Sequence, residues 1–152
     1  MIRFNKPYLF GPELQNVNQA VTQGRLAGNG QFTKQCHKFF EDRYGFSKVL
    51  LTTSCTDALE MSSLLLNIGP EDEIIIPSFT FVSTANAFVL RGAKIVFADS
   101  DESYPNISVD SIRSCITPRT KAIVVVHYGG AACDMNAILR LVKEHDLFLI
   151  ED

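Results

Sequence analysis

The segment TTSCTDALEM, residues 52–61, contains the first residues whose types and spacing could do chemistry. An apolar run ends at about Thr52 and a helical pattern begins near Cys55, with small and hydroxyl residues in the turn between them. The first turn of a helix offers unpaired N–H groups at the positive end of its dipole, which suits a phosphate. Ser54 and Thr56 could add hydroxyl donors. An ordinary Ser/Thr helix cap would explain the same residues, so both interpretations stay open.

Two aromatic residues follow the apolar run EIIIP, in the segment PSFTFVSTANAF at residues 77–88. Phe79 and Phe81 would lie where a strand ends, and an aromatic ring there could stack on a flat heteroaromatic ligand. Phenylalanine is mostly buried in folded proteins, so ordinary core packing is the simpler explanation for either ring taken alone.

The carboxylate of Asp152 ends the apolar segment LFLIED, residues 147–152. A carboxylate at the end of an apolar strand costs free energy unless it has a partner, and a protonated pyridine nitrogen would be a good one. That pairing would keep the ring cationic, as the electron sink of pyridoxal phosphate (PLP) chemistry requires. A solvated side chain at the chain end is the alternative. Together the three segments describe one ligand with a phosphate, a flat ring and a ring nitrogen that needs an anion.

The elements that must position these residues alternate between short apolar runs and helical patterns. The runs are rich in Ile, Val, Leu and Phe on both faces, which is typical of strands buried in a parallel sheet. We therefore expect an α/β fold with flanking helices, right-handed crossovers and about five mostly parallel strands. The expected strands cover residues 48–53, 73–77, 94–99, 121–127 and 147–152, and the helices between them cover residues 56–67, 81–91, a short stretch from Ser108, and 134–145.

Three of the expected helices carry further detail. Residues 56–67 and 81–91 are apolar nearly all round, which predicts deep packing for both helices. The helix at 134–145 begins with a predicted cap at Asp134 and has an apolar stripe that would face the sheet. That stripe consists of Met135, Ile138, Leu139 and Val142.

Two amphipathic helices precede this region, over residues 12–23 and 31–44, and the linker GRLAGNG joins them. We expect an N-terminal helical segment at 1–46 and the first part of a larger ligand-binding domain at 47–152. The last expected strand places a carboxylate at the edge where open α/β sheets bind ligands. A domain rarely ends with its last strand pointing into its own site, so we expect the chain to be part of a longer protein.

Composition argues against several classes of function. The chain has 152 residues, of which 46% are hydrophobic and 20% charged, and its net charge of -3 gives no hint of nucleic-acid binding. No apolar run approaches the roughly 20 residues that a membrane span needs, and no secretory signal is seen, so we expect the cytoplasm. The four cysteines form no CxxC pair and the histidines lack zinc-ligand spacing, so we expect reduced thiols and no metal. A dinucleotide-binding dehydrogenase is disfavoured because no G-x-G-x-x-G follows the first expected strand.

Three longer segments together resemble a known family. They are SCTDALEMSSLLLNIGPEDEIIIPSFTFVSTANAFVLRGAKIVFAD, VVVHYGGAACDMNAI and LFLIED. They are similar to the DegT/DnrJ/EryC1/StrS family of sugar aminotransferases, and the likeness runs over essentially the whole chain. The resemblance implies the N-terminal portion of the large domain of a fold-type I, aspartate aminotransferase-like architecture, with PLP as the cofactor.

Carried over residue by residue, the family's phosphate cradle corresponds to Cys55, Thr56 and Asp57, mainly through backbone amides. Its ring-stacking aromatic corresponds to Phe81, which reverses the expectation of core packing for that residue. Its carboxylate partner of the pyridine nitrogen corresponds to Asp152.

The resemblance also implies roles for residues further from these positions. Ser54 belongs to the same helix start, and His127 lies in a family segment near the cofactor, although a hydrogen-bonded structural histidine is an equal alternative. The linker residues Gly28, Asn29 and Gly30 correspond to a loop on the substrate side.

Within the family, the segments FNKPYLFGPEL, GRLAGNGQFTKQC and KVLLTTSCT resemble the subgroup that forms dTDP-4-amino-4,6-dideoxygalactose. That subgroup moves the amino group of L-glutamate to C4 of dTDP-4-keto-6-deoxyglucose for enterobacterial common antigen, and the complete protein would be a homodimer. There are two alternatives. One is a related aminotransferase that acts at C3 or on a UDP-sugar, and the other is a non-catalytic binding module.

The Schiff-base lysine of the family lies downstream of the position of Asp152. The resemblance therefore implies that this chain alone has no catalytic lysine, lacks the small C-terminal domain and is inactive as a transaminase.

Overall fold

The computed structural model describes residue 2 and residues 5–152. The chain divides into two compact units, one ending at Leu51 and the other covering Thr52–Asp152. Each unit is described by itself.

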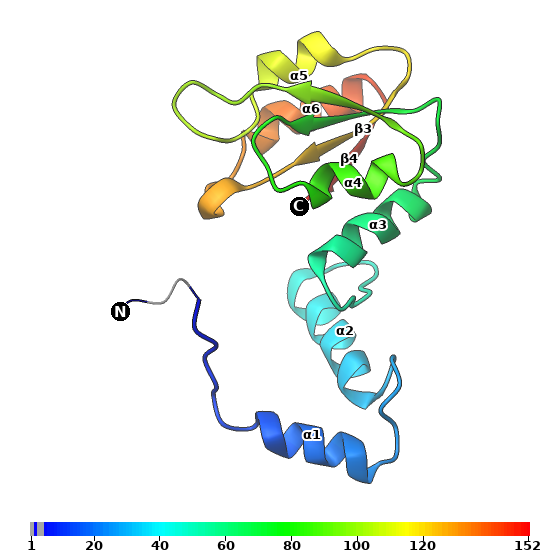
Figure 1. The fold of residues 1–152 in the computed structure, drawn as a ribbon, viewed down its shortest axis with the longest axis vertical. Coiled ribbons are helices and arrows are strands. Elements are labelled where there is room, and N and C mark those ends of the chain that lie inside the picture. The colour runs from blue at the N-terminus through cyan, green and yellow to red at the C-terminus, as the bar shows by residue number, and fades with distance from the viewer. Residues whose placement is uncertain (1, 3–4) are drawn as a thin grey trace. The chain divides into compact units, whose positions relative to one another are not determined.

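A parallel sheet of four strands forms the centre of the second unit (Figure 1). The strands are β1 (Glu73–Pro77), β2 (Lys94–Ala98), β3 (Thr120–Val125) and β4 (Phe148–Glu151), in the order β2-β1-β3-β4. Every neighbouring pair is parallel, which confirms the predicted α/β fold with a parallel sheet. The two central strands, β1 and β3, are almost completely buried, because helices cover both of their faces.

The fifth expected strand, at residues 48–53, does not form, so the prediction of about five strands is wrong. In this run the amide of Val49 donates to Glu41 Oε1 at 3.3 Å and the amide of Leu51 donates to His37 Nε2 at 3.2 Å. These backbone groups are thus bound by side chains, and no strand among the described residues pairs with them. A strand needs a neighbouring edge as well as apolar residues, and the apolar pattern reports only the second requirement.

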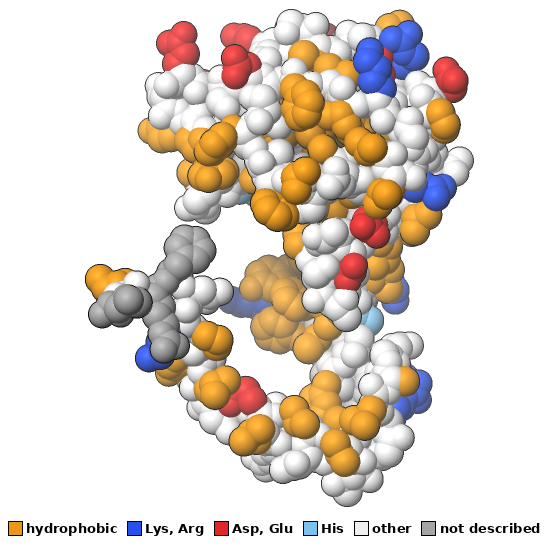
Figure 2. All heavy atoms as spheres, viewed as in Figure 1, with side chains coloured by type: hydrophobic (Ala, Val, Ile, Leu, Met, Phe, Trp, Pro, Cys, Tyr) orange, Lys and Arg blue, Asp and Glu red, His pale blue; other side chains and the backbone are white. Residues whose placement is uncertain are grey.

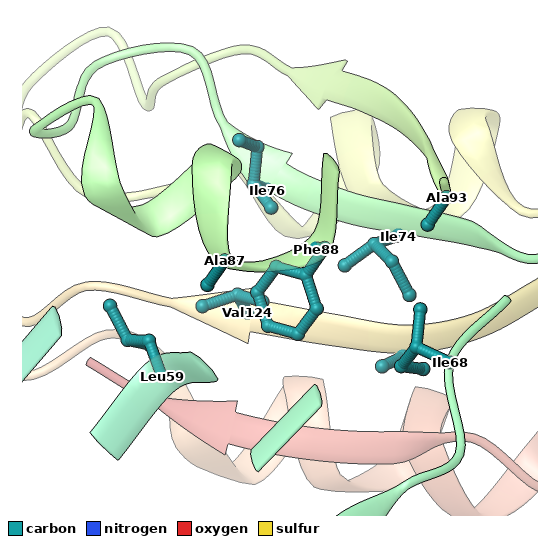
Figure 3. Close-up of a cluster of buried hydrophobic side chains, with 9 residues drawn as sticks. Leu59, Ile68, Ile74, Ile76, Ala87, Phe88, Ala93 and Val124 are labelled. Carbon is teal, nitrogen blue, oxygen red and sulfur yellow. The ribbon is translucent and has the colours of Figure 1, made fainter. Parts of the chain in front are cut away.

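Four helices flank the sheet in two layers. On one face lie α3 (Cys55–Leu65) and α4 (Ser83–Val89), and on the other lie α5 (Val109–Cys115) and α6 (Met135–Glu144). Successive residues of a strand point to opposite faces, so Ile74 and Ile76 pack under α3 and α4 while Ile75 packs against α5 and α6. Figure 3 shows the first of these clusters, with the Phe88 ring of α4 lying over the strands among Ile74, Ala87 and Val124.

The prediction that α3 and α4 both pack deeply is wrong for the outer side of each helix. Leu65 of α3 is 72% exposed and Leu90, the C-cap of α4, is 69% exposed, whereas Leu59 and Phe88 are buried. Figure 2 shows hydrophobic side chains scattered over the visible face of this unit. Each helix contacts the sheet through only one stripe, so apolar residues on the outer side stay exposed.

The predicted cap of α6 is present, whereas the apolar stripe of this helix differs from the predicted one. Asp134 caps the helix, since its side chain accepts from the amide of Ala137 at 3.1 Å. Ile138 is buried together with Leu141, whereas Leu139 is half exposed. Leu139 follows Ile138 by one residue and so lies about 100° around the helix axis, away from the sheet. The predicted helix after Ser108 is also confirmed, with the Ser108 side chain accepting from the amide of Ser111.

The first unit contains α1 (Glu13–Thr22) and α2 (Gln31–Tyr44), close to the predicted bounds. Neither helix has a fully buried residue in the structure, and the apolar residues Leu14, Val17 and Val21 of α1 are exposed. Gly45 ends α2 with a φ of 70°, in the left-handed region that glycine adopts without strain.

Candidate functional site

Three elements of the second unit meet at the carboxyl edge of the sheet. Asp152 follows β4, Cys55 is the first residue of α3, and Thr84 lies in the first turn of α4. The Cys55 thiol donates to Asp152 Oδ1 at 3.2 Å, and the Thr84 hydroxyl donates to Asp152 Oδ2 at 2.5 Å. Two predicted site residues that lie 97 positions apart in the chain are therefore in direct contact.

Thr84 is a site residue that the sequence reasoning missed. In the sequence it follows the candidate aromatic residues Phe79 and Phe81 and lies in the segment STANAF, before the apolar end of α4. The signal that could have found it is a hydroxyl residue at the helix position that faces the sheet, because a buried hydroxyl needs a hydrogen-bond partner. The side chain is 0% exposed and Asp152 is that partner.

The start of α3 has both an ordinary helix cap and free backbone amides that could bind a phosphate. Ser54 is an extended N-cap whose hydroxyl accepts from the amide of Asp57 at 3.1 Å, so the ordinary helix cap is present. The amides of Cys55 and Thr56 have no hydrogen-bond acceptor within residues 5–152. Two of the three predicted cradle residues thus offer free backbone donors at the positive end of α3, and the amide of the third is already bound.

The Asp57 side chain is bound to the turn that precedes α3. Its carboxylate accepts from the Thr53 hydroxyl. The pKa of Asp57 is lowered, first by this hydrogen bond and then by a side-chain hydrogen bond with Ser54. An acid in the first turn of a helix also interacts favourably with the helix dipole.

The neighbouring carboxylate perturbs the thiol of Cys55. Its pKa is raised, first by the hydrogen bond to Asp152, then by partial burial and by the negative charge of Asp152. A raised thiol pKa keeps the group protonated and therefore a donor. The contact between Cys55 and Asp152 is consistent with a neutral thiol facing an anion.

The two candidate aromatic rings have different surroundings. Phe79 packs against Tyr128 with ring centroids 4.8 Å apart and planes at 43°. Phe81 is 74% exposed and forms no aromatic ring pair among the described residues. Core packing therefore does not explain Phe81, whose ring remains accessible to a ligand at the end of β1.

His127 has a protein partner at each ring nitrogen. Its Nδ1 accepts from the amide of Cys133 at 3.1 Å, and its Nε2 lies 2.9 Å from Glu151 Oε2. Because Nδ1 accepts, the hydrogen-bond network assigns the proton to Nε2, which then donates to Glu151. These contacts match the alternative of a structural histidine that fixes the turn at η1 (Tyr128–Gly130).

The predicted substrate-side loop belongs to the first unit. Asn29 adopts the left-handed conformation with a φ of 57°, and Gly30 is the extended residue before α2. Asn29 and Gly30 line an open pocket of about 510 Å³ together with Arg25, Lys34 and Lys38. Gly28 comes directly before Asn29 in the chain and is not among the residues that line this pocket. The role of the loop in substrate binding remains a prediction.

Two broader properties concern the described part of the chain. None of its helices has both the length and the apolar character needed to cross a membrane. Among the same residues, no group of three His, Cys, Asp or Glu side chains is arranged to hold a metal ion.

The fold and this site define a family. A family model of the DegT/DnrJ/EryC1/StrS aminotransferases matches residues 9–152, and the chain belongs to this family. It is 40% identical over 149 residues to the spore coat polysaccharide biosynthesis protein SpsC of Bacillus subtilis, covering 98% of this chain and 38% of that protein. It is 36% identical over 146 residues to the GDP-perosamine synthase of Caulobacter vibrioides, covering 96% of this chain and 39% of that protein. The chain thus spans about two fifths of the length of these curated relatives.

Solved structures agree with this assignment. The aminotransferase TlmJ from Streptoalloteichus hindustanus superposes with a TM-score of 0.92 at 39% identity, over 100% of this chain and 42% of that one. NtdA from Bacillus subtilis, solved with bound cofactor PMP, superposes with a TM-score of 0.85 at 30% identity, over 91% of this chain and 32% of that one. The family is PLP-dependent, which confirms the predicted cofactor class.

The residues at the carboxyl edge fit the two charged ends of PLP. Asp152 is half buried and forms no ion pair with a Lys, Arg or His side chain in residues 5–152. The free amides of Cys55 and Thr56 suit an anion, and a half-buried carboxylate without a cation suits a protonated ring nitrogen.

Proposed function

We propose that this chain is the N-terminal, cofactor-binding part of a PLP-dependent aminotransferase that acts on a nucleotide-linked keto-sugar. The observation that carries the proposal is the contact of Cys55 and Thr84 with Asp152. It brings the start of α3, the start of α4 and the end of β4 to one place. An anion-binding helix start beside a carboxylate without a protein cation is what a phosphorylated pyridinium ring requires.

Each residue of this site has a proposed part in holding the cofactor. The free amides of Cys55 and Thr56 would hold the phosphate. The Ser54 hydroxyl, which accepts from the amide of Asp57, would fix the helix start that presents them. Phe81 would cover one face of the ring. Asp152 would accept a hydrogen bond from the protonated ring nitrogen and so keep that nitrogen positively charged. The cofactor, when bound, supplies an electron sink for the carbanion that forms at the amino acid carbon.

The specific acceptor we propose is dTDP-4-keto-6-deoxyglucose, aminated at C4 with L-glutamate as the donor. The resemblance of the segments around residues 4–14, 24–36 and 48–56 to that subgroup supports it. The names of the relatives, one for spore coat polysaccharide and one for GDP-perosamine, favour a nucleotide-linked sugar destined for a surface polysaccharide. The second name also makes a GDP-linked acceptor the main competitor.

The remaining parts of the complete protein follow from the same proposal. A Schiff-base lysine would lie downstream of Asp152, together with the rest of the large domain and a small domain. The protein would act as a cytoplasmic homodimer, with Gly28, Asn29 and Gly30 on the substrate side of the site.

The test uses the complete protein loaded with PLP. Addition of L-glutamate should convert the absorbance of the PLP form into that of the PMP form, and addition of dTDP-4-keto-6-deoxyglucose should reverse the change. GDP- and UDP-linked keto-sugars serve as competitors. An absence of any change with glutamate would overturn the aminotransferase proposal, and PLP binding without that change would favour a binding module. Reversal by only the GDP- or UDP-sugar would overturn the choice of acceptor.

A further inference from the structure

Thr84 holds one oxygen of the Asp152 carboxylate from a completely buried position. Its side chain is 0% exposed, and its hydroxyl contacts two oxygens, Asp152 Oδ2 at 2.5 Å and Thr80 Oγ1 at 2.8 Å. Figure 1 shows the C-terminus of the chain beside α4, where Thr84 lies. A hydroxyl in such a place is costly unless its hydrogen bonds are satisfied, and here they are.

The direction of these hydrogen bonds follows from the chemistry of the groups. A carboxylate only accepts, so the single hydroxyl proton of Thr84 must point to Asp152. The contact between Thr80 and Thr84 then needs the proton of Thr80, because Thr84 has no second one to give. The direction of both hydrogen bonds is therefore fixed: Thr80 donates to Thr84, and Thr84 donates to Asp152 Oδ2.

The other oxygen of the carboxylate is held much less firmly. Asp152 Oδ1 accepts from the Cys55 thiol, which is an exposed group and a weak donor. A charge-assisted hydrogen bond from a hydroxyl is considerably stronger than one from a thiol. A ligand that donates to Asp152 would replace the thiol at Oδ1 more readily than the buried hydroxyl at Oδ2.

We propose that Thr84 is a positioning residue that fixes the Asp152 carboxylate so that Oδ1 faces the ring nitrogen of the cofactor. This inference rests on the proposed function. Loss of the Thr84 hydroxyl leaves Oδ2 without its donor, and the carboxylate then rotates toward other donors or water. The proton on the ring nitrogen loses its aligned acceptor in consequence.

The experiment compares variants of the complete protein. Thr84→Val deletes the hydroxyl at nearly constant shape, Thr84→Ser restores it, and Thr80→Val removes only the outer hydroxyl. Three readouts are taken: the glutamate half-reaction rate, the thermal midpoint, and the protonation of the ring nitrogen of isotopically labelled bound PLP, measured by NMR. A merely structural role would change the thermal midpoint but not the ring protonation. If Thr84→Val does not fold, Thr84→Ala takes its place.

We expect Thr84→Val to slow the half-reaction by about tenfold or more and to deprotonate a detectable fraction of the bound ring. Thr84→Ser should stay within about threefold of the parent rate and keep the ring protonated. Thr80→Val should have a smaller effect than Thr84→Val, because Thr84 can still donate to Asp152.

Two results would overturn the inference. One is an unchanged ring protonation in Thr84→Val, and the other is an equal loss in Thr80→Val and Thr84→Val. Asp152→Asn separates this inference from the proposed function. If Asp152→Asn alters ring protonation and Thr84→Val does not, only the role of Thr84 fails. If neither variant alters it, the assignment of Asp152 to the ring nitrogen fails.

Discussion

At the amino edge of the sheet, where β1, β2 and β3 begin, the Glu73 carboxylate is enclosed by protein donors. It accepts from Arg119 at 2.6 Å, from Lys94 at 3.0 Å and from the Thr117 hydroxyl at 2.5 Å, and its side chain is only 2% exposed. At the opposite, carboxyl edge, Asp152 has only the thiol of Cys55 and the hydroxyl of Thr84.

The two carboxylates differ in whether the protein supplies a cation beside them. Glu73 is neutralised by two cationic side chains, and its environment lowers the pKa to about 2, first through the Thr117 hydroxyl, then Arg119 and Lys94. Asp152 has no such cation among the residues that the structure describes. A carboxylate paired within the protein contributes to stability, whereas one that lacks a cation is available to a cationic ligand. The predictions below test this contrast.

Asp152→Asn in the complete protein should have the largest effect. The change keeps the shape and removes the charge, so the cofactor ring loses much of its capacity to stabilise the carbanion. We expect the glutamate half-reaction to slow by about a hundredfold or more, or at least roughly 2.7 kcal/mol of barrier. PLP should still bind, because the amides of Cys55 and Thr56 are unchanged. A half-reaction rate within threefold of the parent at saturating PLP would contradict the role given to Asp152.

Glu73→Gln should lower stability without touching the carboxyl edge. The change leaves Arg119 and Lys94 close together without the anion that both contact. We expect the thermal midpoint to fall by several degrees. Glu71→Gln is the matched control, because Glu71 is exposed and lies two positions away. An equal midpoint shift in the two variants would show that the ion pairs at the amino edge do not stabilise the sheet.

The acid stability of the protein should also depend on Glu73. Its pKa is lowered from 4.5 to about 2 in the folded state, so ionised Glu73 stabilises the fold at pH values above its unfolded pKa. That contribution is lost as pH falls from about 4.5 through about 2, because the unfolded chain then takes up a proton first. Urea unfolding measured across this window should show a shallower loss of stability for Glu73→Gln than for the parent. Equal pH dependence of the two proteins would be inconsistent with the pairing.

The smallest expected effect concerns the thiol at the carboxyl edge. Asp152 raises the pKa of Cys55, so Asp152→Asn should lower that pKa and increase the thiolate fraction. Alkylation of Cys55 at mildly alkaline pH, followed by peptide mass spectrometry, should become faster in the variant. Exposed Cys36, in the first unit, gives the internal control for reagent and pH. An unchanged ratio of the two alkylation rates would argue against the contact between Cys55 and Asp152.

The sequence predicted the four strands well because each is a compact apolar run between turns, and both faces of β1 and β3 are buried. It failed at residues 48–53, where the run is equally apolar but its backbone is bound by Glu41 and His37. Pairing partners are a property of the tertiary structure, and apolar periodicity does not report them.

In the candidate site, too, some residues could be predicted from the sequence and others could not. Ser54, Cys55 and Asp152 could be singled out because helix starts and strand ends have recognisable residue types. Thr84 could not, since a threonine in a helix is unremarkable until the structure shows that it is buried against a carboxylate. The contacts of His127 with Cys133 and Glu151 likewise became visible only in three dimensions.

The wide spacing of the residues around Asp152 has a consequence for the order of folding. Its partners lie 97 and 68 positions earlier in the chain, so no local segment can assemble the site. Asp152 directly follows β4, which pairs with β3 alone among the described residues, and β3 in turn pairs with β1. Contacts of such high sequence separation form late, because they require closure of long loops. We therefore expect the Asp152 carboxylate to reach Cys55 and Thr84 only after β1, β3 and β4 have paired.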